Sequence, residues 1–276
     1  MGFLLVVIGV LAHESSGSLH TLQRDDWFYK LLDKFAVTPL ALAVVIALMV
    51  LAVALVLGWL AGAAWWLYLG AELLILLYSF GRGDLARHVD DLAGDLSAEN
   101  VQAAFHEVEN YASSAASEAE NWQQFRDDLM RYLPYQYLDR HYAVIFLFAL
   151  GGGPLALLYR LLRLAQARPL TAELKQPLDF TVWLLEWIPV RMLGLLCALV
   201  GDFVATRAHL SELFFSGKAS SAEALRSFTC GALSIPPANE GATRFGAEVL
   251  PAVRQLYARI MTMALALLAL VVLLMP

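Results

Sequence analysis

The stretch LALAVVIALMVLAVALVLGWLAGAAWWLYLGAELLILLYSF, Leu40–Phe80, decides the fold. Its 41 residues include one charged side chain, that of Glu72. A membrane-spanning helix needs about 20 apolar residues, so the stretch is long enough for two. GWLAG at Gly58–Gly62 has the composition of a turn, and Pro39 suits the first turn of the first helix. The sequence therefore predicts a transmembrane hairpin over 39–80, with two spans and a short uncharged loop.

The composition of the whole chain agrees with this interpretation. Of 276 residues, 59% are hydrophobic and 16% are charged, whereas an ordinary soluble domain has about 45–50% apolar and about 25% charged residues. The mean hydropathy is +0.61. These values predict an all-α, polytopic membrane protein.

Both ends of the chain are apolar. No Lys or Arg precedes the amino-terminal run MGFLLVVIGVLA, and no small-residue cleavage site follows it, so we expect this run to be retained. Its length is too short to span, which favours a half-inserted or bundle-packed helix. With a cytoplasmic amphipathic segment, this helix makes up the region 1–38. The run ending the chain predicts a last transmembrane helix over 256–276, beginning near Leu256.

The segment after the hairpin is strongly acidic. Gly81–His141 carries 12 Asp and Glu residues against 5 Arg, a net charge of −7. Nucleic-acid binding needs a basic surface, so a nucleic-acid partner is excluded. Because Lys30 and Lys34 precede the hairpin and Arg82 follows it, both flanks are predicted to be cytoplasmic.

Helical periodicity predicts soluble helices in the acidic region 81–140 and again in 202–255. The expected core positions of the first region are two stripes, Val101, Ala104, Phe105 and Val108, then Trp122, Phe125, Leu129 and Tyr132. Ser117 with Glu120, and Ser220 with Glu223, have the spacing of capping boxes that begin helices. The region 81–140 is therefore expected to be an acidic cytoplasmic helical subdomain.

Two further apolar runs, within 141–201, contain helix-breaking residues. Gly151–Gly153 and Pro154 interrupt HYAVIFLFALGGGPLALLYRLLRLAQAR, and EWIPVR, with Pro189, interrupts the run from Phe180 to Val200. These interruptions predict broken or re-entrant helices. Discontinuous helices at membrane depth build the binding sites of many transporters.

The breaks supply the candidate site. Backbone N–H groups at a glycine-rich helix start can hold an anion, and ionisable residues at membrane depth are functional candidates by default. The candidate ligand-binding residues are Gly151, Gly152, Gly153, Tyr159, Arg160, Glu186 and Arg191, with Glu72 as a further intramembrane charge. The structural alternative is that Glu186 and Arg191 neutralise each other and that Glu72 pairs with another arginine.

Motifs that would identify an enzyme or a metal site are missing. The segment SGKAS, Ser216–Ser220, lacks the first glycine and the hydroxyl of a phosphate-binding loop. The six histidines share no metal-ligand spacing, and Cys197 and Cys230 provide neither a disulfide framework nor a zinc site. No catalytic residue and no metal site can be assigned.

GGGPLALLYR, Gly151–Arg160, and WIPVRMLGLL, Trp187–Leu196, resemble the GGxPxALxYR and WIPxRL motifs of the AmpE/CobD superfamily of bacterial inner-membrane proteins. Two segments of the cobalamin-synthesising CobD/CbiB branch, ENxSDG and HPSPNAG, are replaced here by YQYLDRHYAV and SIPPANEGATRF. The chain length, the EWIPVR form and the terminal apolar helix are more similar to the AmpE branch.

This resemblance implies a multi-pass inner-membrane signalling protein linked to β-lactamase induction, and hence to antibiotic resistance and peptidoglycan recycling. Its partners would be the lipid bilayer, an anionic small molecule such as a nucleotide or a muropeptide, and a signalling protein. One alternative is an amide ligase that uses ATP and magnesium, cofactors implied by the resemblance alone. Another is a metabolite transporter, which the broken helices and buried charges favour.

Overall fold

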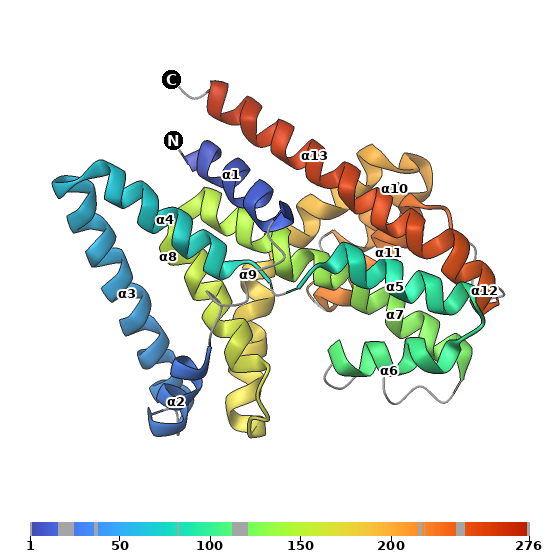
Figure 1. Cartoon of the computed structure of the whole chain (residues 1–276), viewed down its shortest axis with the longest axis horizontal. Coiled ribbons are helices and arrows are strands. Elements are labelled where there is room, and N and C mark those ends of the chain that lie inside the picture. The colour runs from blue at the N-terminus through green and yellow to red at the C-terminus, as the bar shows by residue number, and fades with distance from the viewer. Residues whose placement is uncertain are drawn as a thin grey trace. The chain divides into compact units, whose positions relative to one another are not determined.

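The structure, a computed structural model, describes residues 2–15, 25–35, 38–81, 83–111, 121–214, 217, 219–235 and 241–274. All regular secondary structure in these ranges is helical, as predicted (Figure 1). Within them, four helical segments are long and apolar enough to cross a membrane: Pro39–Ala63, Trp122–Gln166, Ala172–Val200 and Ala242–Leu274. The length and composition of these segments are those of a membrane protein.

The chain forms two compact units, each assembled from two stretches of sequence. Unit 1 comprises Met1–Gly83 and Asp139–Glu186. Unit 2 comprises Asp84–Leu138 and Trp187–Pro276. Most of the candidate site residues, from Glu72 to Glu186, fall in unit 1.

The first helix of unit 1, α1 (Gly2–Ser15), packs against α4 (Trp65–Ser79) and α8 (Ala143–Gln166). A Cβ atom added at Gly9 would lie 2.8 Å from Cδ2 of Leu76, so the glycine permits a close approach to α4. This packing agrees with the second of the two expectations for the amino terminus, a bundle-packed helix.

The predicted hairpin has one full-length helix and one short one. Helix α3 (Pro39–Ala63) begins as expected, with Pro39 in its first turn and the Thr38 hydroxyl accepting a hydrogen bond from the Ala41 N–H at 3.2 Å. Its 25 residues extend about 37 Å, enough to span a core of about 30 Å. The 15 residues of α4 extend only about 22 Å, which is shorter than such a core, so a second full span stays a prediction.

The turn also lies later than predicted. Gly58 and Gly62 continue α3, and the break comes at Ala64, whose φ and ψ are −157° and 96°. A glycine costs about 1 kcal/mol in a helix relative to alanine, which a long apolar helix can absorb without ending. The GWLAG composition was therefore a weak indicator of the turn.

The break predicted at GGGP is confirmed. Within α8, Gly151 (φ −139°, ψ 17°) and Gly152 (φ 68°, ψ −162°) leave helical geometry, and a second half-helix follows with Pro154 in its first turn. The positive φ of Gly152 is unfavourable for residues with a side chain. Helix α8 packs against α3 and α4, so the break lies beside the hairpin.

The break predicted at EWIPVR is wrong. Helix α9 runs from Ala172 to Val200, with Pro189 inside it. A proline removes one hydrogen bond and often kinks a helix, but apolar membrane helices tolerate it when the freed group finds another partner.

Two short elements complete the description of unit 1. Helix α2 (Asp26–Phe35) packs against α3, and the π-helical turn η2 (Leu138–Tyr142) leads into α8. The elements of unit 2 before α13 are α5 (Leu85–Ser97), α6 (Val101–Tyr111), α7 (Trp122–Tyr137), residues 187–200 of α9, α10 (Phe203–Leu213), α11 (Ser221–Ala232), α12 (Ala242–Arg244) and the π-helical turn η3 (Phe245–Val249).

The core of unit 2 contains the predicted apolar stripes. Ala104 and Val108 of α6, and Phe125 and Leu129 of α7, are fully buried. The ring of Phe105 stacks on that of Phe125, with 3.9 Å between their centroids. The helical periodicity therefore identified this core correctly.

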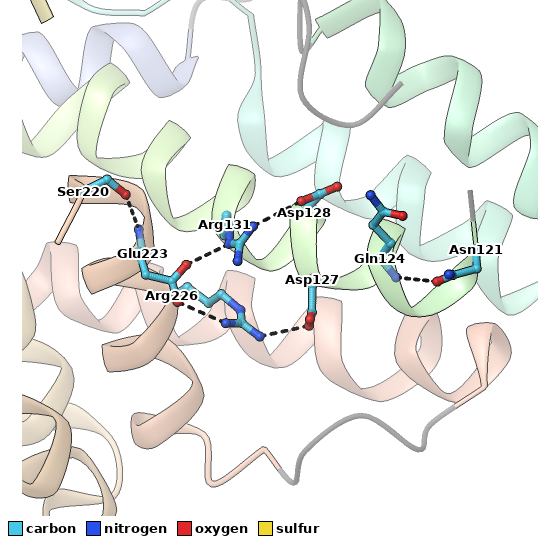
Figure 2. Close-up of polar contacts among 8 residues, drawn as sticks. All are labelled: Asn121, Gln124, Asp127, Asp128, Arg131, Ser220, Glu223 and Arg226. Carbon is cyan, nitrogen blue, oxygen red and sulfur yellow. Dashed lines mark hydrogen bonds and ion pairs between the residues drawn. The ribbon is translucent and has the colours of Figure 1, made fainter. Parts of the chain in front are cut away.

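Polar side chains connect α7 with α11, as Figure 2 shows. Glu223 accepts a hydrogen bond from Nε of Arg131 at 2.8 Å and one from Nη1 of Arg226 at 3.2 Å, while Nη2 of Arg226 reaches Asp127 at 3.0 Å. The predicted cap is present, because the Ser220 hydroxyl accepts from the Glu223 N–H at 3.2 Å. Each oxygen of the Glu223 carboxylate therefore accepts a hydrogen bond from one of the two arginines.

Helix α7 begins at a different cap from the one predicted. The Asn121 side chain accepts from the Gln124 N–H at 2.9 Å. Ser117 and Glu120, the predicted capping pair, lie outside the described residues.

The last helix, α13 (Leu250–Leu274), begins six residues before the predicted start at Leu256. Its first turns are amphipathic, since Val253 is buried whereas Arg254 is exposed and reaches Asp90 at 2.7 Å. The charged face lowers the local hydropathy, so the apolar run alone predicts a start that is too late.

Candidate functional site

The break in α8 holds a carboxylate of the chain itself. The N–H of Gly153, at the start of the second half-helix, donates to Oε2 of Glu72 at 2.7 Å, and both groups are buried. A carboxylate is favourable at this position because the amino end of a helix carries a partial positive charge. Among the described residues Glu72 has no arginine partner, and the alternative of an ion pair with an arginine stays a prediction.

A pocket of about 380 Å³ lies beside this contact. It is lined by Ala54, Leu57, Gly58 and Ala61 of α3, Tyr68 and Glu72 of α4, and Gly151, Gly152 and Pro154 of α8. Tyr68 and Glu72, four residues apart on α4, both line the pocket. We call this cavity the Glu72 pocket, and its polar end is formed by Tyr68 and Glu72.

A second polar group of unit 1 surrounds Tyr159. The Tyr159 hydroxyl lies 2.9 Å from Oε1 of Glu186 in α9 and 3.0 Å from Oδ1 of Asp139 in η2. Tyr159 is 1% exposed and Glu186 is 2% exposed. The structure therefore brings together two of the predicted residues, Tyr159 and Glu186, and adds Asp139.

Arg163 completes this group. Its Nε and Nη2 atoms donate to the two oxygens of Asp139 at 2.6 and 3.1 Å, a bidentate contact. Its Nη1 atom donates to Gln166 at 2.6 Å, and Gln166 in turn donates to Asp179 at 2.6 Å. We call Asp139, Tyr159, Arg163 and Glu186 the Tyr159 cluster.

Arg160, predicted to bind an anion, also faces a carboxylate of the chain. Its Nη2 atom lies 3.4 Å from Oδ2 of Asp25, and the Tyr78 hydroxyl donates to Oδ1 of the same residue at 3.0 Å. Asp25 is 2% exposed. Within the described part of the chain, Nε of Arg160 is buried and has no hydrogen-bond partner.

Arg191, the remaining predicted residue, belongs to unit 2. Its Nε atom donates to the carbonyl oxygen of Phe214 at 3.0 Å, and its Nη1 atom to that of Trp187 at 3.1 Å. The guanidinium lies over the Trp187 ring, 4.2 Å from the centroid. These contacts connect α9 to the end of α10, and a pairing of Arg191 with Glu186 stays a prediction.

Sequence reasoning missed the acidic partners of the predicted residues. Asp139 was counted with the acidic segment, and 135 positions separate Asp25 from Arg160. One signal was present for Arg163, because it follows Tyr159 by four residues and so shares its helical face. No signal in the sequence connects Asp25 to α8.

The described residues add neither a metal site nor a disulfide bond to these contacts. They contain no group of three or more His, Cys, Asp and Glu side chains that could hold a metal ion. Cys197 and Cys230 are both free thiols.

Comparisons of the chain with protein-family models, with curated proteins and with solved structures gave no match.

Proposed function

We propose that the chain is a membrane signalling protein that binds a small polar ligand in the Glu72 pocket. The observation that carries the proposal is the buried contact between Glu72 and Gly153, beside a pocket of about 380 Å³. This volume is within the range of small-molecule sites, and clefts between helices are common places for them. Gly151, Gly152 and Pro154 of the helix break line one side of the pocket.

The chemistry of the pocket changes the expected ligand. The Gly153 N–H, which could have bound a phosphate, donates to the Glu72 carboxylate. A phosphate placed there would meet a like charge, whereas an amine, amide or hydroxyl group could donate to Glu72 or Tyr68. A muropeptide-type molecule carries such donors besides its carboxylates. We therefore favour its donor groups, and not a nucleotide phosphate, as the part recognised in this pocket.

The cellular role rests on the resemblance to the AmpE/CobD superfamily. The GGGPLALLYR and WIPVRMLGLL motifs resemble those of this superfamily of bacterial inner-membrane proteins, and the EWIPVR form is more similar to its AmpE branch. The proposed location is the inner membrane, with several spans, and the proposed role is regulation of β-lactamase induction in response to cell-wall recycling. A protein partner would transmit the signal.

The test is ligand-induced stabilisation of the purified full chain in detergent. We expect a muropeptide to raise the unfolding temperature more than ATP does, because a bound ligand stabilises the folded state. Glu72→Gln should abolish this shift while its side-chain oxygen still accepts from Gly153. Glu248→Gln, at an exposed ion pair with Arg244 in unit 2, is the matched control and should keep the shift.

Two results would contradict this proposal. One is the lack of a shift with any muropeptide in the wild type. The other is a shift of equal size in the wild type and in Glu72→Gln, since the ligand would then bind elsewhere.

A metabolite transporter is the second candidate, favoured by the same broken helix. In transporters, substrate sites form at discontinuous helices with buried charges, and α8 has this form beside Glu72. Uptake into proteoliposomes that is lost in Glu72→Gln would support it. The amide-ligase alternative would need a site for a nucleotide phosphate, and the Gly153 N–H at the helix break already donates to the Glu72 carboxylate.

A further inference from the structure

We propose that one face of α2 binds the headgroups of anionic phospholipids at the surface of the membrane. The face comprises Trp27, Lys30, Leu31 and Lys34, and we call it the α2 lipid face. None of these residues lines the Glu72 pocket. The proposal therefore does not depend on the ligand proposed above, and it rests only on the insertion of α3 into a bilayer.

The contacts of α2 define three faces. On the first, Phe28 and Leu32 are buried. On the second, Asp33 forms an ion pair with Arg168, whose guanidinium also lies 5.1 Å from the centroid of the Tyr29 ring. Residues three, four and seven positions apart share a helical face. The α2 lipid face is the third one, and the helix geometry turns it away from both sets of contacts.

This third face is exposed and positively charged. Trp27 is 45% exposed, and Lys30 and Lys34 are exposed as well. Neither lysine belongs to an ion pair within the described residues. The two acidic residues of α2, Asp26 and Asp33, fall together on the second face. An exposed tryptophan beside cationic side chains is typical of helices that lie at a membrane surface.

The length of α3 places α2 at such a surface. Trp59 is 70% exposed and lies 20 residues after Pro39, about 30 Å along α3. The hydrocarbon core is also about 30 Å thick, so with Trp59 at one headgroup level Pro39 lies at the other. Only residues 36–38 connect α2 to α3, and the two helices pack together (Figure 1). Helix α2 therefore stays beside the headgroups.

Neighbouring charges indicate the kind of lipid. Arg168 contacts α2 through Asp33, so the connection from α8 to α9 lies at the same end of unit 1. This connection continues to Lys175 and has Glu173 as its one acidic residue between 167 and 175. Lys and Arg gather on the cytoplasmic side of membrane proteins, and the lipids of that leaflet carry a negative surface potential. Lysine ammonium groups are suited to donate hydrogen bonds to lipid phosphates.

Quenching of Trp27 fluorescence by brominated lipids tests the proposal. The full chain is reconstituted in bilayers of equal parts phosphatidylglycerol and phosphatidylcholine, with one or the other lipid brominated. The difference between the wild type and Trp27→Phe isolates the signal of Trp27, while quenching of the other tryptophans reports insertion. We expect brominated phosphatidylglycerol to quench Trp27 more strongly, and high salt to reduce the difference between the lipids.

Substitutions on α2 separate charge from structure. Lys30→Gln and Lys34→Gln should each lower the local preference for phosphatidylglycerol about fivefold, the factor expected for one basic residue near an anionic surface. Lys30→Arg keeps the charge and should keep the preference. Asp26→Asn is the matched control, because it neutralises one charge on another face of the same helix, and it should not lower the preference.

Four results would overturn the proposal, and the first needs only the wild type, equal quenching by the two brominated lipids. The second is equal quenching in the wild type and in Trp27→Phe, which would mean that Trp27 does not reach the lipid. The third is a preference that persists when Lys30 and Lys34 are both replaced by glutamine. The fourth is an equal loss in Asp26→Asn, since the effect would then come from the folding of α2.

Discussion

The backbone N–H of Gly153 donates to Oε2 of Glu72 at 2.7 Å, although 81 positions separate the two residues in the chain. The contact holds together α4 and the second half of α8. Since it is buried, each partner depends on the other for its hydrogen bond. The contact leads to the first two predictions.

Glu72→Ala should destabilise the folded protein. The substitution leaves the buried Gly153 N–H without its acceptor, and an unsatisfied buried group costs about 1–3 kcal/mol. Glu72→Gln keeps an acceptor oxygen, so its free energy of unfolding should lie closer to that of the wild type. Reversible denaturation in mixed detergent measures both, and equal losses in the two variants would contradict this role for the hydrogen bond.

Gly152→Ala should also destabilise, through the backbone. The φ of Gly152 is +68°, a conformation that costs a residue with a side chain roughly 1–2 kcal/mol. Gly58→Ala is the matched control, because a Cβ there meets no atom within 4 Å and the residue is helical. That variant should be stabilised by about 1 kcal/mol. A neutral result at Gly152 would contradict the observed break.

Ser220→Ala should weaken the start of α11. The Ser220 hydroxyl accepts from the Glu223 N–H, and removal of such a cap costs about 1 kcal/mol. Ser211→Ala is the control, since that hydroxyl donates to the Ala208 carbonyl within α10 and caps no helix start. Thermal unfolding followed by circular dichroism compares them, and an equal effect in both variants would argue against the cap.

Acid should weaken the contact around Asp202, the amino-terminal cap of α10. Hydrogen bonds from the Ala205 N–H and the Ser234 hydroxyl lower the pKa of this carboxyl group. Because the pKa is lower in the folded state than in the unfolded state, the stabilisation is complete above the unfolded pKa. It is lost as the pH falls through the folded pKa.

Asp202→Asn should remove this part of the pH dependence, because asparagine can cap a helix without titrating. Unfolding curves of the wild type and the variant, recorded from neutral pH down through the range of carboxyl titration, provide the measurement. Parallel pH profiles for the two proteins would contradict the assignment to Asp202.

The sequence predicted those parts of the fold that depend on local chemistry. The GGGP break follows from glycines that permit a positive φ and from a proline that suits a helix start. The buried stripes of α6 and α7 follow from helical periodicity. At EWIPVR the same reasoning failed, because one proline only removes one hydrogen bond and α9 continues through it.

The candidate site was predicted in part. Tyr159, Glu186, Glu72 and the three glycines were identified from their unusual positions in apolar runs. Their partners were not, because Asp25 reaches Arg160, and Glu72 reaches Gly153, through folding of distant segments. Local patterns therefore indicated which polar groups were buried, whereas three-dimensional packing determined that carboxylates of the chain itself satisfy them.

The tryptophans at the start of α4 would define the depth of Glu72 in a bilayer. Trp59, Trp65 and Trp66, at the junction of α3 and α4, are exposed, and tryptophans favour the headgroup level of a bilayer. With this junction at the headgroups, Glu72 lies seven residues along α4, about 10 Å deeper. A ligand that reached the carboxylate from that surface would need to enter only the outer third of the apolar layer, without crossing to its midplane.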